Sequence, residues 1–295
     1  MIDLTGIPAP AVIEALDYEA ILAQNKALAI AQYPALEAAL AYESEPATKL
    51  LQVWSYRELL LRQRVNDAAH ATMLAYATGT DLDNIAARYG VVRLIIQAAD
   101  ASATPPVAEV LEADTELRRR ILLSLDSYTT AGSKGSYIYH ALSASADVLD
   151  ATANSPSPGM VTVYVLSRTG NGAAPEGTLA AVTTALNAET VRPLTDMVTV
   201  LSASVITYTI TGTLHIPAGP DVATVQATAQ AAAQAYADAT HRFECTVGLS
   251  GIYRALHQSG VTTADLTQPT ANITPAVGQV AYCTAINLTV EVSGG

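Results

Sequence analysis

Residues Ser44–Gly79, SEPATKLLQVWSYRELLLRQRVNDAAHATMLAYATG, form the most informative segment of this 295-residue sequence. Ser44 is a favourable N-cap, and Pro46 stands in the first turn, where its missing N–H does no harm. Gly79 follows the last apolar position and is a typical helix terminator. The segment therefore predicts one helix from Ser44 to Thr78, about 50 Å long at 1.5 Å per residue.

Apolar side chains on this predicted helix occupy more than one face. The main stripe has spacings of three, four and seven residues. It consists of Leu50, Trp54, Leu61, Val65, Met73 and Tyr76. Further apolar side chains on neighbouring faces are Leu51, Tyr56, Leu59 and Leu60. Such a helix is either buried inside its own domain or packed in a bundle of several subunits. Its length favours the bundle, because average globular helices have only about 10 to 14 residues.

The rest of the first third is also predicted to be helical. One helix is expected from Ala9 to about Ala31, with a restart or kink at Tyr33-Pro34. A shorter helix is expected to be capped by Thr80, with Asp83 in its first turn, and to end at Gly90.

A stretch of small residues and prolines from Ala98 to Pro106 is predicted to be a linker, and a helix from Asp114 to about Asp126 follows it. Three consecutive arginines, Arg118, Arg119 and Arg120, lie on this helix. They could form a binding patch, but a solvated helix face is the simpler interpretation of such a run.

From Gly132 onward, helices alternate with strands. The first set is predicted as a helix near Ser136–Ser145, strands Val148–Asn154 and Met160–Ser167 with a turn at Ser155–Gly159, a helix Glu176–Ala188 and a strand Met197–Leu201. The second set is predicted as a strand Val205–Leu214, a turn Pro217–Pro220, helices Val222–Thr240 and Gly248–Gln258, and strands Val261–Leu266 and Ile286–Val292.

The whole pattern predicts an α+β multidomain fold, with an N-terminal long-helix region followed by two small α+β modules. Residues 1–97 are assigned to a helical bundle-forming region and residues 98–130 to a linker and connecting helix. Residues 131–201 are assigned to the first α+β module and residues 202–295 to the second. Each module has about 70 to 90 residues, within the usual range for small domains.

Charge and hydropathy limit the kinds of partner. The formal net charge of −12 opposes binding to nucleic acid, because such binding depends on clustered Lys and Arg. The N-terminus lacks the basic start and apolar run of a secretory signal. The uncharged stretch from Met197 to Leu214 is interrupted by Ser and Thr and is typical of strands. We expect neither nucleic acid nor a membrane as partner, and assembly in the cytoplasm.

No familiar catalytic or metal-binding motif is present in the sequence. Gly170-Asn171-Gly172 lacks the Lys and Ser/Thr of a phosphate-binding loop and is interpreted as a flexible loop. Asp81, Asp83 and Asn84 resemble the start of a calcium loop but lack its glycine and distant glutamate, so helix capping explains them better.

The histidines and cysteines also lack the spacing of a metal site. Cys245 and Cys283 are interpreted as free, buried thiols, with a disulfide as the alternative. We predict no catalytic, cofactor-binding or metal-binding residues, although a site assembled from distant residues stays possible.

A series of short segments occurs in order along nearly the whole chain. They are Ile7-Pro8-Ala9-Pro10, Asp17-Tyr18-Glu19, Ile21-Leu22, Glu45-Pro46-Ala47, Lys49-Leu50-Leu51, Tyr56-Arg57-Glu58, Arg64-Val65-Asn66, Gly79-Thr80-Asp81-Leu82-Asp83, Arg118-Arg119-Arg120-Ile121, Ala131-Gly132, Ser157-Pro158-Gly159 and Val191-Arg192-Pro193-Leu194-Thr195-Asp196. In this order they resemble the baseplate J-like family of contractile phage tails and of phage-tail-like particles such as R-type pyocins. The Arg-Pro-Leu-Thr-Asp run is the most distinctive.

The resemblance implies a structural wedge subunit of the baseplate ring, with no enzymatic activity and no cofactor. It implies assembly with a second copy of the chain, a baseplate protein I-like subunit, neighbouring wedges, the hub and spike, and sheath-proximal proteins. In such wedges the N-terminal helices form a three-chain bundle, and rearranged wedge interfaces trigger sheath contraction. The bundle residues expected here are Leu50, Trp54, Leu61 and Val65 in its core and Arg57, Arg62 and Arg64 at its rim.

Two other classes of function stay open from the sequence. One is an enzyme with an unrecognised active site, which titratable groups clustered in a deep pocket would favour. The other is a tail fibre or receptor-binding component, which should show repeats or a β-rich tip.

Overall fold

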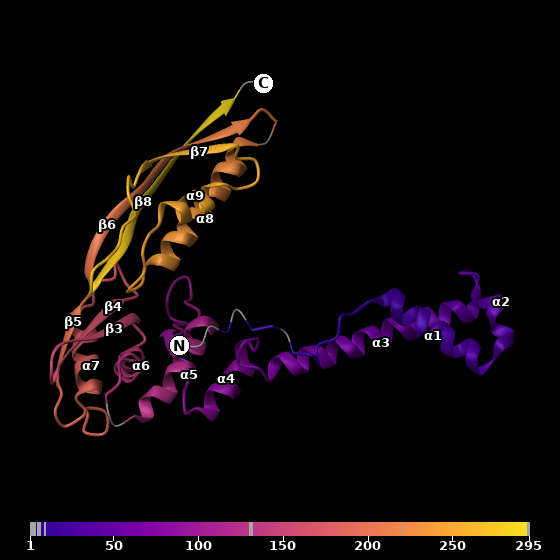
Figure 1. Ribbon diagram of the computed structural model, residues 1–295, viewed down its shortest axis with the longest axis horizontal. Helices are drawn as coiled ribbons and strands as arrows, with labels where there is room; N and C mark the ends of the chain where they lie inside the picture. The colour runs from indigo at the N-terminus through magenta and orange to yellow at the C-terminus, as the bar shows by residue number, and fades with distance from the viewer. Residues whose placement is uncertain (1–3, 5–6, 9, 130–131, 220, 294–295) are drawn as a thin grey trace. The chain divides into compact units, whose positions relative to one another are not determined.

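The computed structural model describes residues 4, 7–8, 10–129, 132–219 and 221–293 (Figure 1). Its elements confirm the predicted α+β class, with a helical N-terminal region followed by α+β modules. The chain divides into two compact units. Unit 1 comprises Met1–Arg93 with Ala113–Leu122, and unit 2 comprises Leu94–Glu112 with Leu123–Gly295.

Unit 1 is built from helices. They are α1 (Tyr18–Gln32), η1 (Pro34–Leu36), α2 (Glu37–Leu40), α3 (Pro46–Ala71), α4 (Gly79–Arg88) and most of α5 (Asp114–Ser124). α1 packs along α3 (Figure 1). Leu82 of α4 and Leu117 and Ile121 of α5 are fully buried in this unit, and Ile21 and Leu22 of α1 are buried as well.

α1 begins later than predicted, because Asp17 caps it. The Asp17 carboxylate accepts the backbone N–H groups of Glu19 and Ala20 at 2.9 and 3.1 Å, which satisfies donors of the first turn. Residues 10–17 form turns and irregular backbone, and the predicted start at Ala9 lies outside the described residues. The predicted restart at Pro34 is confirmed, since this residue opens η1.

α3 is shorter than the predicted helix, at 26 residues and about 39 Å. Glu45 rather than Ser44 occupies the N-cap position, and the helix ends at Ala71 rather than at Thr78. The prediction of an unbroken helix over this stretch is therefore wrong at its C-terminal end, where residues 72–78 form turns and irregular backbone.

Side chains close to the end of α3 explain why the helix stops at Ala71 and the chain turns there. The Thr72 hydroxyl donates to the carbonyl of Ala69 at 2.9 Å, a local bond that competes with helix continuation. The ring of His70 lies against that of Tyr76, with centroids 4.8 Å apart. Met73 and Tyr76, which the sequence pattern placed on the helical stripe, therefore lie beyond the helix and are half-buried.

α4 is capped differently from the prediction. Thr78, which makes no side-chain cap bond, is the N-cap residue. Thr80 lies inside the first turn, so its predicted capping role is wrong. Gly79 has φ +53°, a left-handed conformation that glycine adopts at little cost, and this sharp entry moves the helix start ahead of Thr80.

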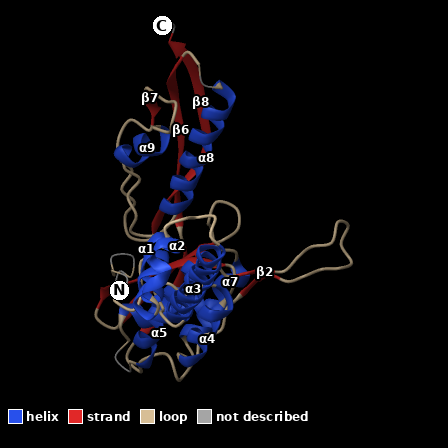
Figure 2. Cartoon of the chain, turned by 90° about the vertical axis from the view of Figure 1, so that its right-hand side faces the viewer, coloured by secondary structure: helices blue, strands red, loops and turns tan. Residues whose placement is uncertain are grey.

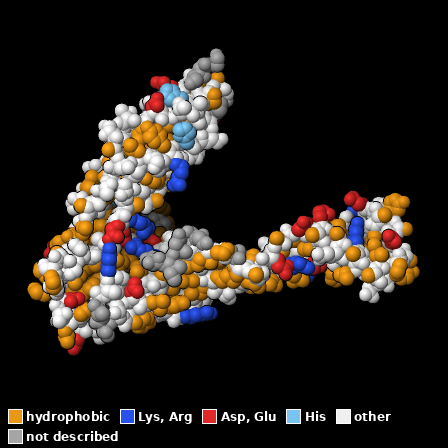
Figure 3. Space-filling model, viewed as in Figure 1, with side chains coloured by type: hydrophobic (Ala, Val, Ile, Leu, Met, Phe, Trp, Pro, Cys, Tyr) orange, Lys and Arg blue, Asp and Glu red, His pale blue; other side chains and the backbone are white. Residues whose placement is uncertain are grey.

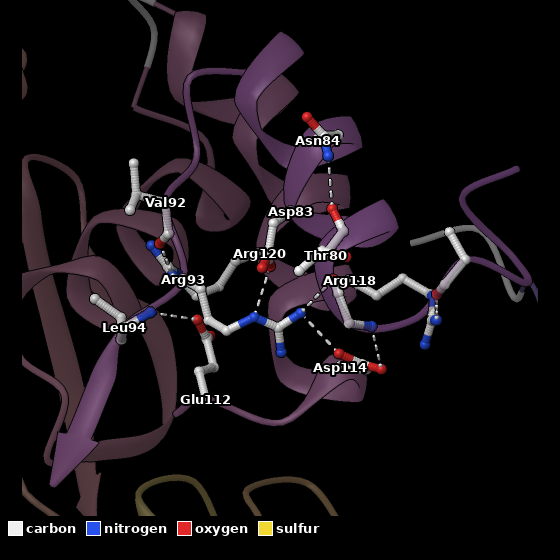
Figure 4. Close-up of polar contacts among 12 residues, drawn as sticks. Thr80, Asp83, Asn84, Val92, Arg93, Leu94, Glu112, Asp114, Arg118 and Arg120 are labelled. Atoms are coloured by element: carbon white, nitrogen blue, oxygen red, sulfur yellow. Dashed lines mark hydrogen bonds and ion pairs between the residues drawn. The ribbon is translucent and has the colours of Figure 1, made fainter. Parts of the chain in front are cut away.

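Arg93 ties α4 to the start of α5 (Figure 4). Its guanidinium pairs with Asp83 at 2.6 Å and with Asp114 at 2.7 Å. Asp114 also accepts the N–H of Gly79 at 3.1 Å. Burial opposes ionisation of Asp114, but the Gly79 N–H and the Arg93 guanidinium outweigh it and hold the pKa of this carboxyl below its ordinary value. Asp83 is thus an ion-pair residue, not a helix cap.

Two of the three consecutive arginines bind backbone carbonyls inside unit 1 (Figure 4). Arg118 donates from Nε to Leu74 and from Nη2 to Ala77, each at 2.7 Å. Arg120 is buried and donates to the carbonyl of Val92 at 3.1 Å. The interpretation of the run as a solvated helix face is wrong for both, because carbonyls left free by turns lie within their reach.

Unit 2 begins with a hairpin of β1 (Ile95–Gln97) and β2 (Val110–Leu111) (Figure 2). Asp100 and Val107 exchange backbone hydrogen bonds of 2.9 Å beyond these strands. The Asp100 carboxylate accepts the N–H and the hydroxyl of Ser102, which stabilises the turn that follows. The predicted linker from Ala98 to Pro106 is therefore an ordered hairpin tip instead.

The first α+β module contains the predicted elements. They are α6 (Lys134–Ala144), β3 (Val148–Ser157), β4 (Met160–Ser167), α7 (Glu176–Leu186) and β5 (Met197–Ser202), preceded by η2 (Leu125–Tyr128). The sheet has the order β3-β4-β5, with β4 antiparallel to β3 and parallel to β5. Its core packs Tyr137 and Ala141 of α6 and Val182 of α7 against Val163 and Val165 of β4.

The second α+β module consists of β6 (Ser204–Pro217), α8 (Val222–Thr240), α9 (Leu249–Leu256), β7 (Thr263–Gln268) and β8 (Gln279–Ser293). β6 is central, antiparallel to β7 and parallel to β8 along its length. β8 starts earlier than the predicted Ile286, because Val280 and Ala281 are buried and pair with β6. The helix predicted over Val222–Thr240 is confirmed; Pro220, in the turn before it, lies outside the described residues.

A single residue, Ala203, separates β5 from β6, and it is buried where the two modules meet. Leu166 of β4, Phe243 after α8 and Val280 of β8 complete this cluster. The carboxylate of Asp150 accepts the N–H of Phe243 at 3.0 Å. The two modules thus share a small core and direct hydrogen bonds within unit 2.

Candidate assembly interface

The fully buried side chains of α3, on the side that faces the rest of its own chain, are polar. The buried residues of α3 are Thr48, Ser55 and Asn66. On a helix with 100° between residues, these three fall on one face. Helices of globular proteins normally bury an apolar stripe on this side, whereas the most buried side chains of α3 are polar and its leucines there, Leu51 and Leu59, are only half-buried.

Hydrogen bonds hold α1 and the segment before it to this polar face. The Asn25 amide donates to the Ser55 hydroxyl and to the Glu58 carboxylate, each at 3.0 Å. Asn66 accepts the N–H of Glu14 at 3.1 Å and donates to its carbonyl at 2.9 Å. These paired bonds fix the position of α1 and residue 14 on α3, alongside the buried Ile21 and Leu22 of α1.

Arg62 completes the polar face. Its guanidinium pairs with Glu58 at 2.7 Å and with Glu14 at 3.0 Å. Hydrogen bonds from Asn25 and Arg62 to the ionised carboxylate hold the pKa of Glu58 below its ordinary value. Arg62, predicted to lie at the rim of a bundle, is thus engaged within its own chain.

The opposite side of α3 is apolar and exposed. Over half of the accessible surface of the predicted core residues is open to solvent: Leu50 63%, Trp54 66%, Leu61 64% and Val65 59%. Arg57 and Arg64 are exposed on the same side. The structure therefore brings six of the seven predicted interface residues onto one outward face, with Arg62 turned toward the chain.

A second exposed row adjoins the first. Val53, Tyr56 and Leu60 are also largely exposed, at spacings of three and four. Val53 was not among the residues predicted from the sequence, although its spacing from Tyr56 and Leu60 is the signal of a further apolar face. We call the two rows together the outer arc: Leu50, Val53, Trp54, Tyr56, Arg57, Leu60, Leu61, Arg64 and Val65. At 100° per residue it covers about 180° of the helix.

A groove of about 500 Å³ runs between α1 and α3, next to the outer arc. Leu28 and Ala29 of α1 and Trp54 and Leu61 of α3 line it. Leu28 is itself exposed, and apolar side chains cover much of the surface of these two helices in Figure 3. A contiguous apolar surface of this kind is typical of a protein–protein contact.

A groove of about 570 Å³ in unit 2 has a polar lining. His241 has its Nδ1 at 2.7 Å from the carbonyl of Ala281, and Asp238 accepts a bond from Gln234 at 2.8 Å. Burial raises the pKa of the Cys283 thiol, which keeps it protonated and weakly nucleophilic. These groups serve contacts within the module.

The remaining candidates for chemistry are the glycine-rich loop and the two cysteines. Gly170-Asn171-Gly172 belongs to a closed turn, in which the N–H of Ser167 donates to the carbonyl of Gly172 at 2.8 Å. Cys245 and Cys283 are both free and half-buried. In the described part of the chain, no three His, Cys, Asp or Glu side chains are grouped so as to hold a metal ion.

Among the residues described above, no helix combines the length and the apolar character that a bilayer crossing requires.

Comparisons with known proteins cover the whole chain. Residues 43–100 match the baseplate J-like N-terminal domain, residues 129–202 the baseplate J-like central domain, and residues 208–289 the baseplate J-like C-terminal domain. Baseplate protein J of Escherichia phage P2 is 46% identical over 300 residues, an alignment that covers 100% of this chain and 98% of that protein.

Proposed function

The chain belongs to the baseplate J-like family, and on this premise we propose that it is a wedge subunit of the baseplate ring around the central spike. Its similarity to baseplate protein J of phage P2 supports a role as a structural subunit of a baseplate. The finer role, which is to close the ring and to transmit the trigger for sheath contraction, is the proposal. It applies equally to a phage tail and to an R-type pyocin.

The observation that carries this proposal is the reversed polarity of α3. Ser55 and Asn66 face the chain itself, whereas Trp54 and Leu61 face solvent. Leaving such side chains exposed forgoes about 1.5–3 kcal/mol each relative to burial. Contact with other subunits is the arrangement in which this apolar surface becomes buried.

The width of the outer arc supports a bundle of three helices. One helix–helix contact uses an apolar stripe of about 100°, so an arc of about 180° has room for two neighbours. A second copy of the chain and a smaller subunit like baseplate protein I are the proposed neighbours. Neighbouring wedges, the hub and spike, and sheath-proximal proteins would contact the remaining surface.

Structural rather than enzymatic action is part of the proposal. The polar groups in the groove of unit 2, such as His241 and Asp238, bind backbone or side-chain atoms of the same module. Interfaces made of many modest contacts suit a two-state trigger, because they can be exchanged without unfolding a deep core.

Electron microscopy of assembled particles tests the role in the ring. The expected result is density for this chain in the ring around the spike, and its absence from that ring would overturn the proposal. At residue level, Leu61→Asp should prevent co-purification with the other wedge subunits while the free chain stays folded by circular dichroism.

The matched control for Leu61→Asp is Gln24→Asp, which places the same charge on an exposed position of α1. It should leave assembly unchanged. If both variants assembled like the wild type, α3 would not be the contact helix.

A further inference from the structure

Two arginines interrupt the apolar surface of the outer arc. Arg57 and Arg64 are seven residues apart, so they lie within about 20° of each other on the helix, near the middle of the arc. Both are exposed. Leu50, Leu61 and the neighbouring apolar side chains surround them along α3.

Several other arginines of unit 1 are engaged within their own chain, unlike these two guanidinium groups. Arg62, Arg93 and Arg118 each bind carboxylates or carbonyls of their own chain. For Arg57 and Arg64, by contrast, the described part of the chain offers no hydrogen-bond or ion-pair partner. Their donors are therefore available to another molecule.

A partner that covers the apolar arc also covers these charges. A guanidinium taken out of water without an acceptor is strongly destabilising, whereas one that meets a carboxylate forms the most favourable, bidentate kind of hydrogen bond. The covering surface must therefore supply acceptors at two points about one heptad, or roughly 10 Å, apart along a helix.

A second copy of α3 does not meet this requirement. With two copies parallel and in register, Arg57 would face Arg57. With two copies antiparallel about the midpoint between the two arginines, it would face Arg64. The acidic residues within α3 are Glu58 and Asp67, nine residues apart, and Glu58 is already bound to Arg62. Like charges facing each other at an interface are unfavourable.

We propose that the outer arc docks a helix of a different protein chain whose contact face is apolar except for two carboxylates about seven residues apart, which pair with Arg57 and Arg64. This inference rests on the proposed wedge assembly and identifies the kind of partner that fits there. In a wedge with two copies of this chain, the arginines of both copies would point toward that acidic helix, and the charge pairs would set its register.

A charge series in complete particles tests the proposal. Particles are produced with both arginines changed together to Lys, to Ala or to Glu, and the yield of assembled particles is compared with the wild type. The lysine variant should retain most of the yield, the alanine variant less, and R57E/R64E should lower it roughly 30-fold or more, in line with the loss expected for a broken interfacial charge pair. Circular dichroism of each free chain confirms that α3 still forms.

Carbodiimide cross-linking of the R57K/R64K particles identifies the partner directly, because this reagent joins an amine to a carboxylate in contact with it. The chain has only three native lysines, Lys26, Lys49 and Lys134, so the background is low. Cross-links from positions 57 and 64 to two acidic residues about seven apart, in one helix of another protein, would support the proposal.

Three results would overturn it: cross-links to a second copy of this chain, equal particle yields across the series, or a lysine variant as impaired as R57E/R64E. A failure of the proposed function would give a different result, namely wild-type particles that lack this chain in the ring. The cross-links would still report which surface covers α3.

Discussion

Glu244 accepts a hydrogen bond from the hydroxyl of Thr152 at 3.0 Å, so a residue of the second α+β module holds a strand of the first. Lys134, also in the first module, pairs with the same carboxylate. The backbone of Glu244 has φ +58°, a left-handed conformation that residues with a β-carbon rarely adopt. The contacts between the modules are thus made from a strained position.

Replacing Glu244 separates the side-chain contacts from the backbone strain. Glu244→Ala removes both contacts and keeps the strain, whereas Glu244→Gly removes both and relieves it. We expect the glycine variant to be more stable than the alanine variant by about 1 kcal/mol, measured by urea unfolding. Equal stabilities, or a less stable glycine variant, would show that φ +58° costs nothing here.

The same carboxylate predicts a pH dependence. Hydrogen bonds from Lys134 and Thr152 to its charged form hold the pKa of Glu244 below its ordinary value of 4.5. Because the pKa is lower in the folded state, the stabilisation is complete above 4.5 and is lost as the pH falls through the folded-state value.

Glu244→Gln should therefore reduce the free energy of unfolding at neutral pH, and the difference from the wild type should shrink as the solution is acidified. Since both side chains of the ion pair are more than half exposed, a difference of only about 1 kcal/mol or less is expected. Urea unfolding at a series of pH values provides the measurement, and a difference that stayed constant through the acidic range would contradict it.

Arg118→Ala tests the turn after α3. The change leaves the carbonyls of Leu74 and Ala77 without the charged donor that binds them at 2.7 Å. We expect the free energy of unfolding of unit 1 to fall by about 2 to 3 kcal/mol, observed as faster amide exchange in α4 and α5.

The control for this change is Arg88→Ala. Arg88 is exposed at the end of α4, and the described residues offer it no hydrogen-bonding partner. Its removal should alter stability by no more than about 0.5 kcal/mol. Similar losses for both variants would mean that the carbonyl contacts contribute little.

Gly278→Ala tests the close approach of the two modules. Gly278 has φ +76°, and a β-carbon there would lie 2.5 Å from the ring of Tyr164 in β4. Because the alanine would have both a strained backbone and a collision with the ring, we expect the free energy of unfolding to fall by about 2 to 4 kcal/mol. Thermal unfolding measures the loss.

Gly170→Ala separates the two effects, because Gly170 has φ +63° but open space around its missing β-carbon. It should lower the free energy of unfolding by only about 1 kcal/mol. Were the two alanine variants equally destabilised, the Tyr164 ring would have to move aside at no cost.

Local signals in the sequence predicted much of the fold. The helix over Val222–Thr240 and the strand starting at Met160 were recovered because caps, turns and apolar periodicity are encoded by neighbouring residues. The end of α3 was missed because the ring contact of His70 with Tyr76 and the bond of Thr72 compete with helix formation, which no periodicity reveals.

The candidate interface was predicted only in part, for a different physical reason. The apolar stripe of α3 was visible in the sequence, but which face meets the chain depends on partners such as Asn25 and Glu14, which bind α3 from 30 or more positions away. The same distance hid the role of Arg118, whose acceptor Leu74 lies 44 residues earlier in the chain.

The single residue between β5 and β6 has a mechanical consequence. Ala203 leaves no slack between the two sheets, so tension applied to one sheet reaches the other through a backbone that is already extended. β6 is held by β8 in a parallel ladder from Ser204 to Pro217. A force along β6 loads this ladder in shear, so its hydrogen bonds share the force instead of opening one after another. The connection of β5 to β6 is therefore a stiff link between the two modules.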